Sequence, residues 1–254
     1  MIIASYLSWF VMAGCIGTIA AVILGVSAAL RRAEWRPSER RVTVRAAAAV
    51  LVGWFAVAVV LASFGVYRGS AARLPTIQFG IVIPILIGCL ALWRSTALSR
   101  LIDATPRHWI IGVQAYRVEG VIFLILYATG LLPGVFALPA GAGDVATGLL
   151  GLGIAINAAH RRQLRPRSVL LWNLFGIADL IVALTTGFLT SPSPLQRFAF
   201  DRPNQLISMF PLVLIPTFLV PLAIVLHIIS LIQLGRASAR GNTGLARADD
   251  PVRA

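Results

Sequence analysis

Four ionisable side chains stand inside long apolar stretches of this chain, where a membrane-spanning helix would bury them. They are Arg117, Glu119, Asp179 and His227. Asp179 falls in the middle of its stretch, where a charged carboxylate costs about 2.5–3.5 kcal/mol on insertion scales. Either an arginine or a bound proton offsets that cost and the carboxyl only fixes helix packing, or Asp179 titrates with protons or binds a cation.

Arg117 is the natural partner for Asp179, because a guanidinium keeps its proton at any physiological pH. On an α-helix Arg117 shares a face with Gln114. Glu119 follows only two residues later and would point about 160° away from Arg117. We therefore expect Glu119 to find a different neighbour. The alternative for both charges is a position at the headgroup boundary, with their side chains extended toward water.

His227 and Asn173 are predicted at a depth similar to that of Arg117, which would place the three in one polar layer. A single buried histidine is usually a hydrogen-bonded packing residue, and a proton relay is the sharper alternative. The other two histidines, His108 and His160, fall at the predicted membrane boundary. A haem held by two histidines within the bilayer is therefore not expected.

Asp144 ends an apolar connection of residues 133–144 and precedes the next apolar stretch. A carboxylate at the start of a helix accepts hydrogen bonds from its free backbone N–H groups and interacts favourably with its dipole. We therefore expect Asp144 to cap that helix at the outer end of the bundle. A gate or a ligand contact is the alternative role.

Several kinds of chemistry are missing from the residue types. All 22 basic residues are arginine, so no lysine amine can form a Schiff base with retinal or pyridoxal phosphate. Cys15 and Cys89 are far apart and lack the paired spacing of a zinc or redox site. The sequence also lacks a nucleophile elbow and a Walker-type phosphate loop. No metal and no cofactor is predicted.

Composition indicates that lipid is the solvent of most of the chain. Of the 254 residues, 58% are hydrophobic and only 12% are charged, and apolar stretches of about 20 residues, the length that spans a bilayer, recur along it. The predicted fold is an all-α integral membrane bundle of seven transmembrane helices in residues 1–233, followed by a disordered cytoplasmic tail, 234–254. The predicted spans are residues 2–30, 46–66, 78–93, 109–132, 144–159, 168–189 and 207–233.

Arginines orient this bundle, because positively charged loops stay in the cytoplasm. With the N-terminus outside and the C-terminus in the cytoplasm, inner segments hold 17 arginines and outer segments four. Adding or removing one span would invert the bias of every later loop, so the distribution supports seven. The least certain boundary is that of span four, which starts near Trp109 or, alternatively, covers residues 121–138 with 109–117 lying flat on the membrane.

Small residues at helical spacing mark the faces where helices in a membrane pack closely. Spans one, five and six carry such stripes, which we expect in the bundle interior. The stripes are Gly17, Ala21 and Gly25; Asp144, Gly148, Gly151, Ala155 and Ala158; and Asn173, Gly176, Asp179, Ala183 and Gly187. Span seven instead contains Pro211, Pro216 and Pro221, which predict a bent or broken helix.

Three functions fit these features. The first is a small proton-coupled permease that uses Asp179 with Arg117, Glu119 and His227. The second is a non-catalytic assembly or sensory subunit that binds another membrane protein through the stripe of span five. The third is a membrane-embedded enzyme acting on a lipid or isoprenoid with an acid and base drawn from Glu119, Asp179 and His227. We favour the first, because no complete catalytic set is visible.

The expected partners follow from the same features. They are the lipid bilayer, a small-molecule solute and, for the second function, a membrane protein. The arginines are explained by topology, so no nucleic acid is expected. The predicted location is the bacterial plasma membrane.

Overall fold

The computed structural model describes residues 2–161 and 164–248, and within them every regular element is a helix. The α-helices are α1 (Ile2–Arg32), α2 (Pro37–Ser63), α3 (Ile77–Arg94), α4 (Thr96–Ala104), α5 (Arg107–Val113), α6 (Val121–Ala128), α7 (Gly134–Arg161), α8 (Pro166–Thr190) and α9 (Val220–Ala248). The tighter or wider helices are the 3₁₀-helices η1 (Gln114–Gly120) and η2 (Leu206–Ser208) and the π-helix η3 (Ile215–Leu219).

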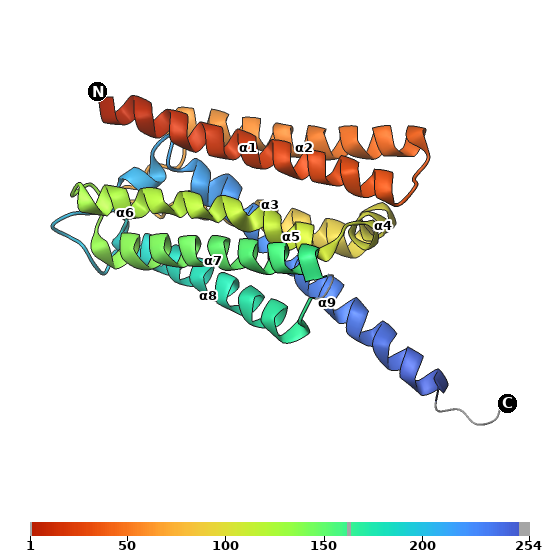
Figure 1. Ribbon diagram of the computed structural model, residues 1–254. Helices are drawn as coiled ribbons and strands as arrows, with labels where there is room; N and C mark the ends of the chain where they lie inside the picture. Colours follow the sequence, from red (N-terminus) through yellow and green to blue (C-terminus); the bar gives the residue numbers. More distant parts are fainter. Residues whose placement is uncertain (1, 162–163, 249–254) are drawn as a thin grey trace.

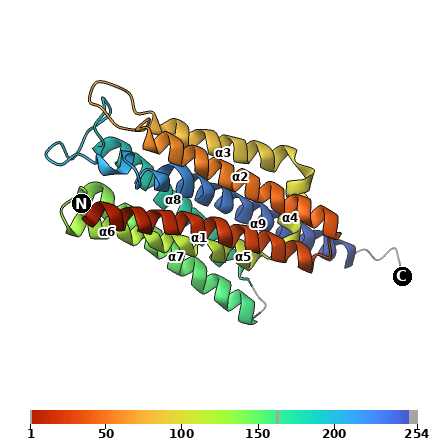
Figure 2. The same ribbon diagram turned by 90° about the horizontal axis from the view of Figure 1, so that it is seen from above.

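Seven stretches of the described chain are long and apolar enough to cross a membrane. The prediction of an all-helical fold with seven such helices is confirmed. They lie side by side along a common direction, with the N-terminus at one end of the bundle and the C-terminus at the other (Figures 1 and 2). We call the first the N-terminal end. The second, which holds the turn from α1 to α2, α4 and the start of α8, we call the arginine-rich end.

The last span forms the centre of the bundle. In its most apolar stretch 67% of the residues are buried, against 11% in α2 and in α3. The α9 helix packs against α3, α5 and α8, and η3 against α1, α2 and α3, so α9 lies among the other helices (Figure 2). Phe218 of η3 is fully buried, with its ring centroid 4.7 Å from that of Trp54 and 5.2 Å from that of Phe55.

The break predicted in span seven is present. The segment passes through η2, a turn and the π-helix η3 before α9 begins at Val220. Pro216 lies within η3, and Pro221 is the second residue of α9, which follows η3 directly. The span itself starts at Ile215, so Pro211 precedes it.

Two other boundaries differ from the predicted ones. The apolar connection 133–144 is helical, because α7 begins at Gly134 and includes Pro139. At the other end of the chain α9 continues to Ala248, so residues 234–248 of the predicted disordered tail are helical. The last six residues, 249–254, lie outside the described chain.

Span four follows the earlier of its two predicted starts. The chain crosses as α5, η1 and α6, which together form one membrane-compatible stretch from Arg107 to Ala128. The seven-residue 3₁₀ segment in its middle is longer than the three or four residues usual for this helix type. It is also the segment that carries Arg117 and Glu119.

The small-residue stripes of α7 and α8 face the interior, as predicted. On α8 the buried residues include Asn173, Gly176, Asp179 and Gly187. The prediction for α1 is wrong, because a Cβ atom added at Gly17 or at Gly25 would meet nothing within 4 Å. The buried face of α1 instead holds larger side chains, among them Leu7, Val11, Cys15 and Ile19.

Candidate functional site

The 3₁₀ geometry of span four aligns its buried side chains. Ile111, Gln114, Arg117, Gly120 and Phe123 are all buried and occur at every third position. Residues three apart eclipse one another in a 3₁₀-helix, whereas on an α-helix they drift around the axis. The tighter winding therefore keeps Arg117 and Gln114 on the single line that faces the interior.

Two glycines of α7 allow η1 to pack closely against that helix. A Cβ added at Gly148 would lie 2.9 Å from the Val118 nitrogen, and one added at Gly141 would lie 3.0 Å from the Gly120 carbonyl oxygen. The first distance is shorter than real Cβ contacts allow, and the second is tighter than most of them. The backbones of η1 and α7 can thus pack together only because these positions lack a side chain, and this brings Arg117 against Asp144.

Arg117 is the hub of a buried polar cluster. Its Nε donates to Asp144 Oδ1 at 2.7 Å, and its Nη2 donates to Asp179 Oδ2. Its Nη1 donates to the Gly176 carbonyl oxygen at 3.3 Å and lies 3.1 Å from His227 Nε2. The three charged side chains are only 2%, 12% and 5% exposed for Arg117, Asp144 and Asp179. One guanidinium thus joins α7, α8 and α9.

The cluster fixes the proton positions on His227. Arg117 can only donate, so the facing Nε2 of His227 must accept and the imidazole is neutral with its proton on Nδ1. Nδ1 lies 2.9 Å from Asn173 Oδ1, which accepts this proton. The Asn173 amide then donates to Ser230 Oγ at 2.9 Å and to the Val169 carbonyl. Every hydrogen bond in this series, from Arg117 through His227 and Asn173 to Ser230, therefore has a donor on one side and an acceptor on the other.

Glycines make room for each of these polar groups. A Cβ at Gly143 would overlap the Asp179 carboxylate, and one at Gly176 would lie 2.5 Å from the His227 ring. A Cβ at Gly120 would overlap Asp144 in the same way. Trp172 covers the other side of His227, with ring centroids 4.8 Å apart, and its Nε1 donates to the Thr147 carbonyl at 2.9 Å. The side chains are therefore held by packing as well as by hydrogen bonds.

The structure brings most of the predicted site residues into one place. Asp179, Arg117, His227 and Asn173 form the polar layer, near the middle of their spans. Gln114 lies one turn from Arg117 toward the arginine-rich end and is fully buried. Neither atom of its amide has a hydrogen-bond partner, and the same holds for the Thr147 hydroxyl.

The prediction that Asp144 caps a helix is wrong. Because α7 starts at Gly134, Asp144 lies well inside the helix. The apolar residues before it form additional helical turns instead of a loop, and this moves Asp144 from the outer end to the level of Arg117. Its carboxylate is then satisfied by a guanidinium and not by free N–H groups.

Glu119 stands apart from the cluster, as its position in the sequence predicted. A Cβ at Gly14 of α1 would overlap its carboxylate, so Glu119 faces α1. In the described chain it makes no hydrogen bond or salt bridge. It nevertheless lines a small cavity together with Tyr116, Arg117 and Asp144. The Tyr116 hydroxyl in this cavity donates to the Leu219 carbonyl at 2.9 Å.

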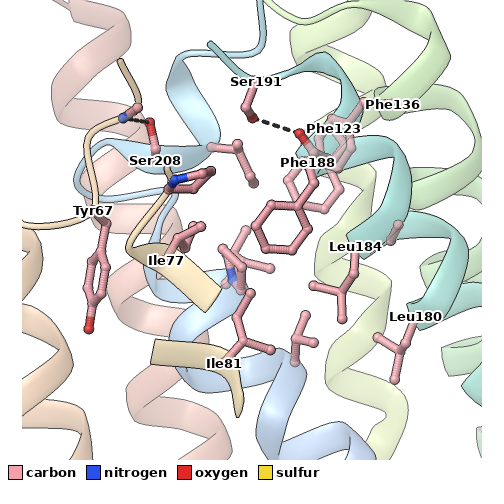
Figure 3. A pocket seen from close by; sticks show the side chains of 18 of the residues that line it. Tyr67, Ile77, Ile81, Phe123, Phe136, Leu180, Leu184, Phe188, Ser191 and Ser208 are labelled. Atoms are coloured by element: carbon pink, nitrogen blue, oxygen red, sulfur yellow. Dashed lines mark hydrogen bonds between the residues drawn. The ribbon is translucent and has the colours of Figure 1, made fainter. Parts of the chain in front are cut away.

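A larger, apolar pocket reaches Asp144 from the N-terminal end. It lies between α3 and α8, with Ile77 and Ile81 on one side and Leu180, Leu184 and Phe188 on the other (Figure 3). Its cavity volume is about 50 Å³, within about 680 Å³ of space between the walls that includes the open mouth.

Three residues near the mouth of this pocket are polar: Tyr67, Ser191 and Ser208 (Figure 3). Ser208 Oγ accepts from the Gly69 N–H at 3.4 Å, and Ser191 donates to the Gly187 carbonyl at 2.7 Å. Burial raises the pKa of Tyr67, so its hydroxyl stays protonated and adds no charge. The rim is therefore polar and neutral.

A separate polar cavity of about 220 Å³ opens at the arginine-rich end. Asp103, Arg107, Gln233 and Arg236 line it, and Arg236 Nη1 lies 3.1 Å from Asp103 Oδ1. Gln233 donates to the Ile102 and Thr105 carbonyls while its own carbonyl oxygen is buried without a partner. Across residues 2–161 and 164–248, no three His, Cys, Asp or Glu side chains are grouped to hold a metal ion.

These features define a multi-pass membrane protein with an ion cluster buried in a helical bundle. The chain belongs to the family described as domain of unknown function DUF8737, whose model matches residues 74–235. That match covers α3 to most of α9 and includes the whole Arg117 cluster. No curated protein and no solved structure matched the chain.

Proposed function

We propose that this protein is a small proton-coupled permease of the bacterial plasma membrane, with the Arg117 cluster as its coupling site. The observation that supports this most is the composition of the cluster. One guanidinium stands between two buried carboxylates, Asp144 and Asp179. With both carboxylates ionised, the cluster carries one negative charge in excess.

An excess charge shielded from water is unfavourable, because a low dielectric strengthens every uncompensated interaction. Either a proton on Asp144 or Asp179, or a bound cation, removes the excess. A site that must hold one or the other can exchange them, which is the elementary step of coupled transport. A purely structural ion pair would need only one carboxylate for its arginine.

Buried polar atoms extend from the cluster toward the arginine-rich end. The Gln114 amide, the Thr147 hydroxyl and the Gln233 carbonyl oxygen all lack protein partners, and Gln233 lines the polar cavity at that end. Buried polar groups of this kind are usually satisfied by water. We propose that water at these positions carries protons between the cluster and that end.

The apolar pocket approaches the cluster from the opposite end. Asp144 therefore lies between an apolar route on one side and a series of buried polar atoms on the other. The wall shared by the pocket and the Glu119 cavity includes Ile215 of the π-helix η3 and Val220 at the start of α9. Helix discontinuities near the bilayer centre are common hinge and binding elements in transporters. We propose that movement at η3 exposes Asp144 to one route at a time.

We assign the orientation from the arginine distribution: the N-terminus outside, and the arginine-rich end with the C-terminus in the cytoplasm. In this orientation the apolar pocket approaches from the outer half of the membrane. The proton route then starts in the cytoplasm.

Proton flux in proteoliposomes tests this function. Vesicles that contain the dye pyranine and hold a pH gradient would be given tetraphenylphosphonium, choline, alanine or glucose in turn. We expect at least one solute to dissipate the gradient with the wild-type protein, and Asp179→Asn to abolish that effect. Asp201→Asn, which alters an exposed loop carboxylate, is the matched control. Equal dissipation by Asp179→Asn, or none by the wild type, would contradict the proposal.

A further inference from the structure

The apolar pocket between α3 and α8 has an uneven distribution of charge. Of the residues that line it, Asp144 alone is charged, and it lies at the end of the pocket that reaches the cluster. The remaining wall is almost entirely aliphatic and aromatic, apart from the neutral polar rim. A molecule that fills this space therefore meets hydrocarbon along most of the wall and a carboxylate where the pocket reaches the cluster.

Around the inner end of the pocket, acidic side chains outnumber basic ones. Asp144 belongs to the cluster with one negative charge in excess, and the adjoining cavity adds the unpaired carboxylate of Glu119. Only Arg117 opposes these charges, and four of its five N–H groups already point at Asp144, Asp179, Gly176 and His227. An anion at this end of the pocket would lie against the Asp144 carboxylate, with the carboxylates of Asp179 and Glu119 nearby.

Three aromatic rings strengthen the preference for a cation. Phe123 and Phe136 stand edge to face in the pocket wall with centroids 5.2 Å apart, and Phe188 extends into the same space (Figure 3). The face of an aromatic ring attracts an organic cation, and more strongly where water is excluded. Apolar length, aromatic faces and a terminal carboxylate together match one ligand class.

We propose that this pocket binds a lipophilic organic cation, with its apolar body between α3 and α8 and its positive charge at Asp144. The cation takes the place of the proton that otherwise balances the cluster. Binding of one therefore displaces the other, and the two would move in opposite directions. The role of the cation as transported solute rests on the proposed function, whereas its binding does not.

Equilibrium binding of radiolabelled tetraphenylphosphonium to the full-length protein in detergent tests the pocket without any transport step. We expect saturable binding that unlabelled tetraphenylphosphonium displaces. Tetraphenylborate, which has the same shape and the opposite charge, should not displace it. Binding that is absent, or that tetraphenylborate displaces equally well, would overturn the proposal.

Two variants locate the cation. Asp144→Asn should weaken binding by about tenfold or more, because the ligand charge loses its partner in a site shielded from water. Leu184→Trp should abolish binding by filling the pocket while leaving the cluster unchanged. Ile181→Trp is its control, because Ile181 is one turn away on α8, is 60% exposed and does not line the pocket.

These results separate the pocket from the proposed function. Binding that is lost in Leu184→Trp and retained in Ile181→Trp supports the pocket, even if no solute dissipates a pH gradient in vesicles. Binding unchanged by both Asp144→Asn and Leu184→Trp overturns the pocket, even if the protein proves to be a permease for another solute. Because Asp144→Asn leaves Arg117 paired with Asp179, thermal unfolding can verify that this variant is folded.

Discussion

At the scale of single residues, the molecule is organised around one arginine and the glycines that surround it. The predicted membrane depths of Arg117, Asn173 and His227 were similar, and this placed them in one polar layer. The buried carboxylate of Asp179 needed a counter-charge, and this predicted its pairing with Arg117. The position of Asp144 was not predicted, because an apolar segment with Pro139 and three glycines resembles a loop. A proline near a helix start removes only a single hydrogen bond, and helix packing in lipid tolerates those glycines.

The sequence could not show which glycines make room for polar side chains, because that depends on which residue packs opposite each glycine. Gly143→Ala should destabilise the protein by about 1–3 kcal/mol, because its Cβ forces the Asp179 carboxylate out of its place. Thermal unfolding in detergent measures this. Gly153→Ala on the same helix is the control, with no atom within 4 Å of its added Cβ. Equal unfolding temperatures for the two variants would show that the Asp179 carboxylate does not need the space left by Gly143.

Arg117→Gln should destabilise the bundle by about 3–5 kcal/mol, because it leaves two buried carboxylates without a counter-charge. Adding Asp144→Asn and Asp179→Asn to it should recover part of this loss, since the uncompensated charges are then gone. Denaturant unfolding of the single and triple variants measures both effects. A triple variant less stable than Arg117→Gln would contradict the charge balance described for the cluster.

At the scale of elements, hydropathy located the seven spans but could not distinguish helix types. The 3₁₀ winding of η1 accompanies its close packing against Gly148 and Gly141 of α7, whereas the π winding of η3 coincides with Pro216. Local composition indicates the prolines of span seven but does not record the packing of η1 against α7. The predicted divergence of Glu119 from Arg117 nevertheless held, because residues two apart face different sides of either helix type.

A hydrogen bond from the Tyr116 hydroxyl to the Leu219 carbonyl links η1 to η3. Tyr116→Phe should remove about 1 kcal/mol of local stability and so increase amide hydrogen exchange in residues 215–224, which mass spectrometry can follow. Tyr127→Phe is the control, because the Tyr127 side chain is 42% exposed on the same span. Exchange that rises equally in both variants would mean that the Tyr116 bond does not restrain η3.

At the scale of the whole molecule, the count of seven spans could be predicted because every loop constrains it. Orientation is a separate claim, and labelling tests it. In a background without Cys15 and Cys89, Ala71→Cys should react with an impermeant maleimide in intact bacteria. Ala97→Cys should react only after permeabilisation. Both alanines are exposed, at opposite ends of the bundle, and the reverse pattern would contradict the proposed orientation.

The central claim is that the buried cluster holds a proton which a cation can replace. Infrared difference spectroscopy of the lipid-reconstituted protein measures this most directly, because a protonated carboxyl has its own carbonyl stretch. We expect a band that appears on acidification, decreases when tetraphenylphosphonium is added, and is missing in the Asp144→Asn, Asp179→Asn double variant. A wild-type spectrum that matches the double variant at every pH would contradict the claim.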